Sequence, residues 1–419
     1  ILTRLLTPEI FGLIALAQVF LTGVTMLSDV GVRASVIRST RGDEDAFLRT
    51  AWSVQIARGT IIALLCCLLA WPAAQLYDEP VLFPLICVLS ISSLITGFRS
   101  ISAAHANRKL MLKTLTLLDL ASKTITLFVT VFLAWQMQSV WALAIGITIG
   151  ATVKVILSHV MLPPFAHRVF FEREALREIM GFGSWILLAT LFSFLAARGQ
   201  QAIYGLLVPV EVIGLMAIAL LIASVPRDLF QKLLNTVVLP SFSELVRNRP
   251  HDLPAALRKV RFVTIGIAFP ILFVVSWFAQ PIIDLLYDDR YAAAGVILTF
   301  AALNSAVPIL STTYQNVLLA EGRSDLYALL MFVWATAVTL GIFVGFNIAG
   351  LVGSLAGAGL GAGFMFLINA AIALRRGYST GLLDMIALSV VAAFYIFMLS
   401  TADILPAFLS PELIEEAFD

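Results

Sequence analysis

The sequence predicts an all-α integral membrane protein with two pseudo-symmetric six-helix lobes and one extra helix near its C-terminal end. Three observations predict this fold. The 419 residues are 60% hydrophobic and only 13% charged, with a mean hydropathy of +0.97, whereas about 25% of the residues in a soluble domain are charged. Apolar runs of about 20 residues, the length that spans a bilayer as a helix, follow one another along the chain, and none alternates as a barrel strand would. Finally, a short motif recurs about 200 residues after its first copy.

The repeated motif is a proline and a glutamate placed ahead of an apolar helix. The first copy is TPEIFGLIALAQ, which contains Gly12, and the second is VPVEVIGLMAIALL, which contains Gly214. A proline at a helix start sacrifices no hydrogen bond, and a carboxylate there meets the positive end of the helix dipole. We therefore expect the same helix in each lobe, with Gly12 and Gly214 superposing and lying at close helix approaches.

Twelve apolar runs are long enough to cross a bilayer. They are Glu9–Val32, Phe47–Leu76, Pro80–Ala104, Leu112–Trp135, Val140–Leu162, Gly183–Tyr204, Val210–Thr236, Val260–Leu286, Ala292–Leu319, Leu326–Phe346, Ala349–Leu374 and Leu382–Ser400. Because Ile1–Leu6 resembles the end of an apolar segment, we expect that a first helix has been lost. With it restored, each lobe has six helices, and an axis along the membrane normal relates them.

The runs define four parts of the chain. We expect an N-lobe at 1–162, a cytoplasmic amphipathic linker at 163–182, a C-lobe at 183–374, and an extra helix with an outward-facing tail at 375–419. In the linker, apolar residues alternate with charged ones at a roughly helical period, which is typical of an interfacial helix. These apolar residues are Val169, Phe170, Leu176, Ile179 and Met180.

Basic residues fall on alternate connections. One side of the membrane receives 21 of the 27, in Arg33–Arg49, Arg99–Lys113, Arg168–Arg177, Arg227–Arg261, Arg323 and Arg375–Arg376. Basic loops mark the cytoplasmic side of a membrane protein. We therefore place these loops in the cytoplasm and Asp78 and Asp289 on the opposite side.

The sequence gives no sign of an enzyme or of a cofactor site. A net charge of +1 does not indicate nucleic acid as a partner, and the three cysteines lie in apolar runs without the spacing of metal ligands. The four histidines lie in or near cytoplasmic loops and are interpreted as solvated side chains. We expect no catalytic residue, no metal and no cofactor.

Arg58, Lys123, Lys154 and Arg198 lie within the predicted spans and outside the basic connections listed above. Each would cost about 2.5–3.5 kcal/mol if it faced lipid at the bilayer centre, so we expect them to face an interior. Asp119, interpreted as the only well-buried carboxylate, precedes Lys123 by four residues, which leaves Lys123 either its structural partner or a ligand. Lys154 and Arg198 could also reach the interface.

A polar face follows one predicted helix of the second lobe. Asn304, Ser305, Pro308, Ser311, Thr312 and Gln315 recur at helical spacing. These side chains either join helices by hydrogen bonds or line a water-filled cavity. With the four bases, and with Gln55 one turn from Arg58, they describe a cavity suited to an anion that carries a sugar-like portion.

Three segments carry a family resemblance: RLLTPEIFGLIALAQ, LSDVGVRASVIRS and AWSVQIARG. They resemble the opening helices of the polysaccharide-transporter branch of the multidrug/oligosaccharidyl-lipid/polysaccharide exporter superfamily, nearest its colanic-acid and lipopolysaccharide exporters. The resemblance implies two six-helix lobes of the multidrug-exporter type around a V-shaped cavity. It also implies alternating access and the flipping of undecaprenyl-pyrophosphate-linked oligosaccharide across the bacterial inner membrane. Basic residues of the family's cavity meet the pyrophosphate, and Arg58 is the best match to them.

Two other function classes stay open. A cation-coupled small-molecule antiporter of the same superfamily needs buried carboxylates, and a membrane glycan polymerase or ligase needs a long outward-facing loop. The sequence offers little of either. The partners expected are the lipid-linked oligosaccharide, membrane lipids, a coupling ion (H⁺ or Na⁺) and a polysaccharide polymerase.

Overall fold

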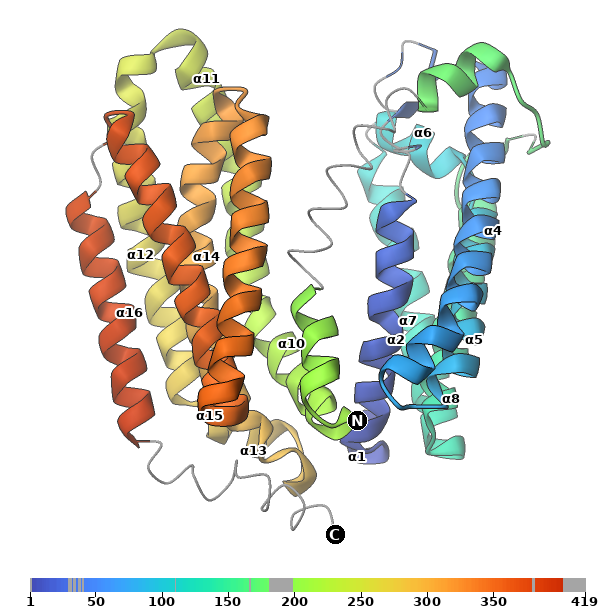
Figure 1. The fold of residues 1–419 in the computed structure, drawn as a ribbon. Helices are drawn as coiled ribbons and strands as arrows, with labels where there is room; N and C mark the ends of the chain where they lie inside the picture. The colour runs from blue at the N-terminus through green and yellow to red at the C-terminus, as the bar shows by residue number, and fades with distance from the viewer. Residues whose placement is uncertain are drawn as a thin grey trace. The chain divides into compact units, whose positions relative to one another are not determined.

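The computed structural model describes residues 2–28, 32, 35–36, 39, 41–109, 111–165, 167–180, 199–378 and 381–401. Within these ranges all regular secondary structure is helical. The chain divides into two compact units, unit 1 (Ile1–Gly214) and unit 2 (Leu215–Asp419). Figure 1 shows the helices of both units.

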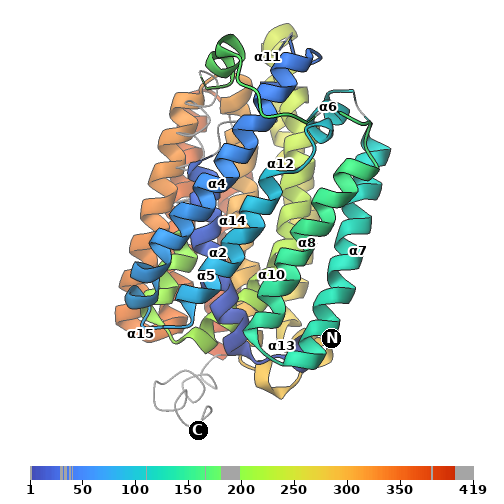
Figure 2. The same cartoon turned by 90° about the vertical axis from the view of Figure 1, so that its right-hand side faces the viewer.

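The helices of unit 1 follow the predicted apolar runs closely. They are α1 (Leu2–Leu5), α2 (Pro8–Leu27), α4 (Asp45–Leu76), α5 (Leu82–Gly97), α6 (Ser102–Arg108), α7 (Leu112–Met137), α8 (Val140–Val160), the helical residues 173–180 and 199–207, and the start of α10 (Val210–Leu233). Figures 1 and 2 show α4 and α5 side by side. Most of the predicted span Gly183–Tyr204 lies outside the described residues.

The predicted span Pro80–Ala104 is broken in the structure. Helices α5 and α6 meet at an angle of 60°, and the side-chain amide of Gln55 on α4 bonds the carbonyl groups at the break. Its Nε2 donates to the carbonyl oxygens of Gly97 and Arg99, each at 2.9 Å. Carbonyl groups at a helix end lack helical donors, so Gln55 stabilises the bend.

The two motif glycines lie at one close approach between α2 and the first turn of α10. A Cβ added to Gly12 would lie 1.9 Å from the carbonyl oxygen of Val210, and one added to Gly214 would lie 1.8 Å from that of Pro8. Pro8 and Gly12 on one helix correspond to Val210 and Gly214 on the other, so the contact is reciprocal. This confirms the close approach expected from the repeat, whereas the superposition of two lobes stays a prediction.

Unit 2 contains most of α10 and the helices that follow it. After α10 come a π-helical turn, η1 (Leu234–Val238), then α11 (Leu239–Asn248), η2 (Pro250–Asp252), α12 (Leu253–Trp277), α13 (Ala279–Leu286), η3 (Asp289–Tyr291), α14 (Ala294–Ala320), α15 (Ser324–Arg375) and α16 (Gly381–Thr401). The predicted span Val260–Leu286 is two helices, of which α12 begins seven residues earlier than expected. The first turns of α12 carry charged residues, so the search for apolar runs left them out, but they are helical.

Helix α15 is a hairpin of two antiparallel helices. It is continuous over 52 residues except at Ala349 and Gly350, where the backbone leaves the helical region and Gly350 has a φ of +56°. A Cβ on Gly345 would lie 1.9 Å from the carbonyl oxygen of Gly353, so the two halves pack backbone against backbone, as small residues permit within membranes. The two predicted spans Leu326–Phe346 and Ala349–Leu374 are therefore both present.

Eight described helices are long and apolar enough to cross a membrane, or nine if the bent α5–α6 pair forms one span. Helix α15 is one of the eight, and at 52 residues it would extend about 78 Å as a straight helix. Since a bilayer core is about 30 Å thick, α15 supplies two spans. The chain is an all-helical integral membrane protein, as predicted.

Candidate functional site

A cluster of charges lies among the membrane-spanning helices of unit 1. Lys154 on α8 forms an ion pair with Asp119 on α7, with Nζ 2.8 Å from Oδ1. The Asp119 side chain is 48% exposed and that of Lys154 is 36% exposed. The pair therefore stands at the edge of the helix packing, where a ligand can reach it.

Two further bases act on the same carboxylate through their charge. Arg99, at the α5–α6 break, and Lys123, on α7, are the next electrostatic partners of Asp119 after Lys154. The sequence leaves Lys123 as either the structural partner of Asp119 or a ligand, but the ion pair is made by Lys154, and Lys123 is exposed. Three bases around one carboxylate leave a surplus of two positive charges, and this group is called the cationic cluster below.

Glycine packing between α7 and α8 brings the cluster together. A Cβ on Gly146 would lie 2.3 Å from Oγ1 of Thr130, and one on Gly150 would lie 2.6 Å from Oγ1 of Thr126. The two helices are antiparallel, so the next turn of α8 places Lys154 beside the turn of α7 that carries Asp119. The small volume of the glycines sets this register between the two helices. An i,i+4 rule, which compares residues within one helix, therefore cannot predict that Lys154 meets Asp119.

The other predicted residues of unit 1 join helices. Arg58 donates from Nη2 to the carbonyl oxygen of Thr25 at 2.8 Å, near the C-terminal end of α2, where a cation is favourable. Gln55 holds the carbonyl group of Arg99, so α4 fixes the backbone that presents that base. Arg198 lies outside the described residues.

The predicted polar face on α14 is mostly engaged in packing. Asn304 donates to the carbonyl oxygen of Leu355 at 3.0 Å and accepts from Oη of Tyr395 at 2.7 Å. Ser305 bonds within its own helix, Ser311 is buried, and Gln315 is half-buried. Asn304 and Tyr395 also line a cavity of about 500 Å³ whose other walls are almost entirely apolar.

Unit 2 contains a buried ion pair that the sequence reasoning missed. Arg261 on α12 is fully buried, and its Nη2 pairs with Asp384 on α16, which is 4% exposed. Nη1 of Arg261 donates to Oγ1 of Thr313 at 2.6 Å, and Tyr314 donates to the other oxygen of Asp384. The guanidinium carbon of Arg261 also lies 4.0 Å from the ring centroid of Tyr314.

Two sequence interpretations are corrected by this pair. The basic-residue pattern assigns Arg261 to a cytoplasmic loop, but it lies buried inside α12. Asp119, expected to be well buried, is half-exposed, and among the described residues Asp384 is a buried carboxylate. The sequence did contain a sign of this pair, because Arg261 and Asp384 are charged residues that lie inside predicted spans. Their separation of 123 residues concealed the pairing.

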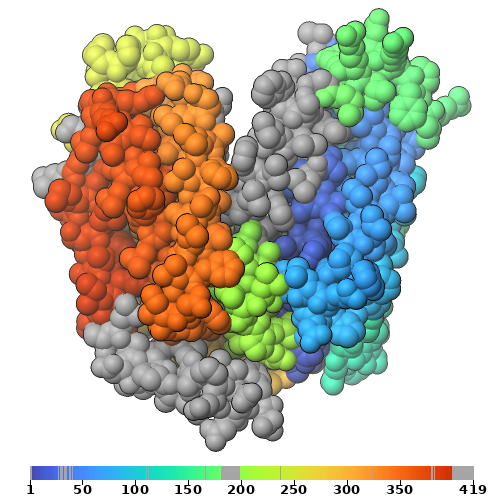
Figure 3. All heavy atoms as spheres, viewed as in Figure 1, coloured from blue at the N-terminus to red at the C-terminus, as the bar shows by residue number. Residues whose placement is uncertain are grey.

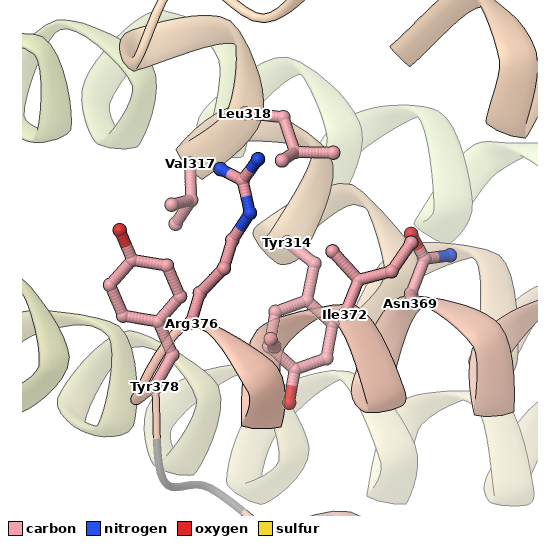
Figure 4. A pocket seen from close by; sticks show the side chains of 8 residues that line it. Tyr314, Val317, Leu318, Asn369, Ile372, Arg376 and Tyr378 are labelled. Atoms are coloured by element: carbon pink, nitrogen blue, oxygen red, sulfur yellow. The ribbon is translucent and has the colours of Figure 1, made fainter. Parts of the chain in front are cut away.

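A second ion pair lies near the end of α15. Arg376 and Tyr378 both bond the carboxylate of Glu321. With Tyr314 and Asn369 they surround a pocket of about 10 Å³ (Figure 4). That volume admits about one water molecule, so the pocket is too small for a large cargo.

Loop charges in unit 1 hold its connections together. Asp43 lies 2.8 Å from Nε2 of His105 and accepts from Nε of Arg108 at 3.1 Å. The bond from His105, with the charge of Arg108 nearby, holds the pKa of Asp43 below its usual value. Arg41 donates from Nη2 to both oxygens of Glu172, at 2.9 and 2.8 Å.

In the described residues no group of three or more His, Cys, Asp or Glu side chains is placed to hold a metal.

Comparison with known families and proteins gives consistent matches. A family model described as "Polysaccharide biosynthesis protein" matches residues 1–295. The succinoglycan biosynthesis transport protein ExoT of Rhizobium meliloti (strain 1021) is 20% identical over 335 residues, 80% of this chain and 66% of that protein. The teichuronic acid biosynthesis protein TuaB of Bacillus subtilis (strain 168) is 22% identical, over 74% of this chain and 64% of that protein.

The lipopolysaccharide biosynthesis protein WzxC of Escherichia coli (strain K12) is 19% identical, over 78% of this chain and 66% of that protein. The chain thus spans slightly less than two thirds of the length of these relatives.

Solved structures share the fold. An inward-facing multidrug resistance MATE family transporter of the MOP superfamily aligns with a TM-score of 0.70 and 12% identity, over 89% of this chain and 92% of that one. The lipid II flippase MurJ in an inward closed conformation aligns with a TM-score of 0.66 and 16% identity, over 93% and 91% of the two chains. These likenesses confirm an all-helical membrane fold like that of the two solved transporters, whereas the symmetry of two six-helix lobes and the lost first helix stay predictions.

Proposed function

This chain belongs to the polysaccharide biosynthesis protein family, and from that membership we propose that it is a flippase for surface polysaccharide biosynthesis. Its cargo is undecaprenyl-pyrophosphate-linked oligosaccharide, carried across the bacterial inner membrane by alternating access. Relatives named for succinoglycan transport and lipopolysaccharide biosynthesis support a saccharide cargo. A gradient of H⁺ or Na⁺ drives the cycle, and a polysaccharide polymerase receives the cargo outside.

The observation that carries this proposal is the cationic cluster. Lys123 is the twelfth residue of the 26-residue helix α7, near the middle of its span. A base at that depth is costly unless an anion or a polar interior accompanies it, and Asp119 neutralises only one of three. A diphosphate that leaves the headgroup layer needs such partners, because charge-assisted hydrogen bonds replace the water it loses.

Each base has a separate role in this mechanism. Lys154 is shared between Asp119 and the cargo, Lys123 contributes a mobile charge, and Arg99 contributes a planar guanidinium that suits phosphate oxygens. Arg58 and Arg198 complete the proposed set of phosphate ligands. The α14 face, from Asn304 to Gln315, is proposed to meet sugar hydroxyl groups.

A test of the cluster replaces Lys154 with glutamine. We expect surface polymer to fall at least tenfold in a host that depends on this chain, with unchanged protein in the membrane. Lys113→Gln, an exposed lysine at the start of the neighbouring helix α7, is the matched control and should keep export. Arg58→Ala should also lose export, and Arg58→Lys should recover it in part.

A double variant separates cargo binding from a structural pair. If Lys154 served only to neutralise Asp119, then Asp119→Asn would restore export to the Lys154→Gln protein. If Lys154 binds phosphate, the double variant stays inactive. Recovery of full export would reject the cationic-cluster mechanism.

The orientation is tested separately. We propose that the loops at Lys109 and Arg249 are cytoplasmic and that Asp78 and Asp289 face outward, because the basic residues are so unevenly divided. Single cysteines at these four positions, treated with an impermeant maleimide in cells with a permeable outer layer, should be labelled at 78 and 289 alone. The reverse labelling would invert the topology.

The antiporter alternative is less well supported. Cation-coupled exchange needs a carboxylate free to exchange protons or ions, and the buried carboxylate Asp384 already pairs with Arg261 and accepts from Tyr314. An arginine stays protonated at any physiological pH. Asp384 is therefore better suited to a structural role than to ion exchange.

A further inference from the structure

A fixed loop of unit 1 leads from the end of α8 to the helical residues 173–180. The backbone N–H of Phe170 donates to Oγ of Ser53 at 2.9 Å, and that of Glu172 donates to Oγ1 of Thr50 at 3.0 Å. Both acceptors belong to α4. Residues 170 and 172 are therefore attached to that helix through their backbone N–H groups, which do not occupy the side chains of Val169, Phe170 and Phe171.

The apolar side chains of this region divide into two groups. Ala175 and Ile179, on residues 173–180, are fully buried in one core cluster with residues of α4. The predicted interfacial helix therefore buries part of its apolar face within the protein, while Met180 is 47% exposed. Val169, Phe170 and Phe171 are instead 68%, 45% and 55% exposed. In Figure 3 the green surface of this region projects beyond that of α4.

The position of the loop along α4 fixes its depth in the membrane. Helix α4 has 32 residues and ends at Leu76, whereas a bilayer core takes about 20 helical residues. Counting back from Leu76, the core ends near residue 57. Ser53, which holds Phe170, lies about one turn beyond that boundary, at the level of the lipid headgroups.

We propose that Val169, Phe170 and Phe171 form a membrane anchor that inserts into the lipid leaflet beside the N-terminal end of α4. A headgroup layer is where partly apolar loops settle, provided that their backbone groups are bonded, and here α4 supplies the acceptors for Phe170 and Glu172. Arg168, exposed next to the three apolar side chains, donates to lipid phosphate. The proposed topology makes this the cytoplasmic leaflet.

The anchor is tested with nitroxide spin labels on single cysteines in the full chain. The native residues Cys66, Cys67 and Cys87 are first replaced by alanine, and the protein is reconstituted into vesicles of phosphatidylethanolamine and phosphatidylglycerol. Labels at positions 169 and 171 should collide at least threefold more with lipid-soluble oxygen than with a water-soluble nickel chelate. A label at Glu174, whose side chain is 87% exposed, is the matched control and should show the opposite preference.

Two outcomes would overturn the anchor. Nickel accessibility at 171 equal to that at 174 would place the loop in water. Exclusion of both reagents at 171 would mean that protein, from a partner or a second copy, covers the site. Neither result depends on export, so the flippase proposal and the anchor can fail independently.

Discussion

Replacing Arg261 with alanine is expected to destabilise the protein by about 3–5 kcal/mol, the usual consequence of leaving one charge of a buried pair without its partner. Asp384 is 4% exposed and would keep the bond from Tyr314 but lose its ion pair. The loss should appear as a large fall in the thermal unfolding midpoint of the detergent-solubilised protein. It should also release α16 from α12, which the ion pair joins.

The control for this experiment lies one turn earlier on the same helix. Arg258 is exposed, so Arg258→Ala should change the midpoint little. Replacing both partners, as Arg261→Met with Asp384→Leu, should recover most of the lost stability, since a buried pair can often be exchanged for apolar residues of similar volume. An Arg261→Ala protein as stable as Arg258→Ala would show that the pair contributes nothing.

The apolar runs predicted the helices well because the bilayer imposes one length and one composition on every span. The run Phe47–Leu76 became α4 (Asp45–Leu76), and Val140–Leu162 became α8 (Val140–Val160). The method failed where a helix leaves the apolar layer. The charged first turns of α12 were missed, and the bend between α5 and α6 depends on Gln55, a residue of another helix.

The candidate site was only partly predictable for a related reason. Composition identified Lys123, Lys154 and Asp119 as unusual residues, because charge within a span is costly wherever it points. Which charges meet depends on helix register, and the glycines of α8 set that register against α7. Arg99 was not singled out, because it lies at a bend that the apolar run concealed.

The two copies of the glycine motif, although short, mark the two helices of one contact, α2 and α10. Gly12 faces the carbonyl group of Val210, and Gly214 faces that of Pro8. In each case the nearest atoms are backbone, which cannot rotate aside as a side chain can. The contact therefore requires glycine on both helices.

Alanine at either glycine is expected to reverse the usual effect of this substitution. In a helix interior, glycine to alanine normally stabilises by about 0.5–1 kcal/mol. At Gly12 the new Cβ would lie 1.9 Å from a carbonyl oxygen, so α2 and α10 must separate, and overpacking of this kind costs about 1–3 kcal/mol. Gly266→Ala on α12 is the matched control, since a Cβ there meets nothing within 4 Å.

The measurement is the thermal unfolding midpoint, together with export of surface polymer in cells. Gly12→Ala and Gly214→Ala should each lower the midpoint, while Gly266→Ala leaves it unchanged or raises it. Since both substitutions separate the same pair of helices, the double variant should lose less than the sum of the single losses. Additive losses would mean that the glycines act at independent places, and the reciprocal contact between the two motif copies would then have no energetic meaning.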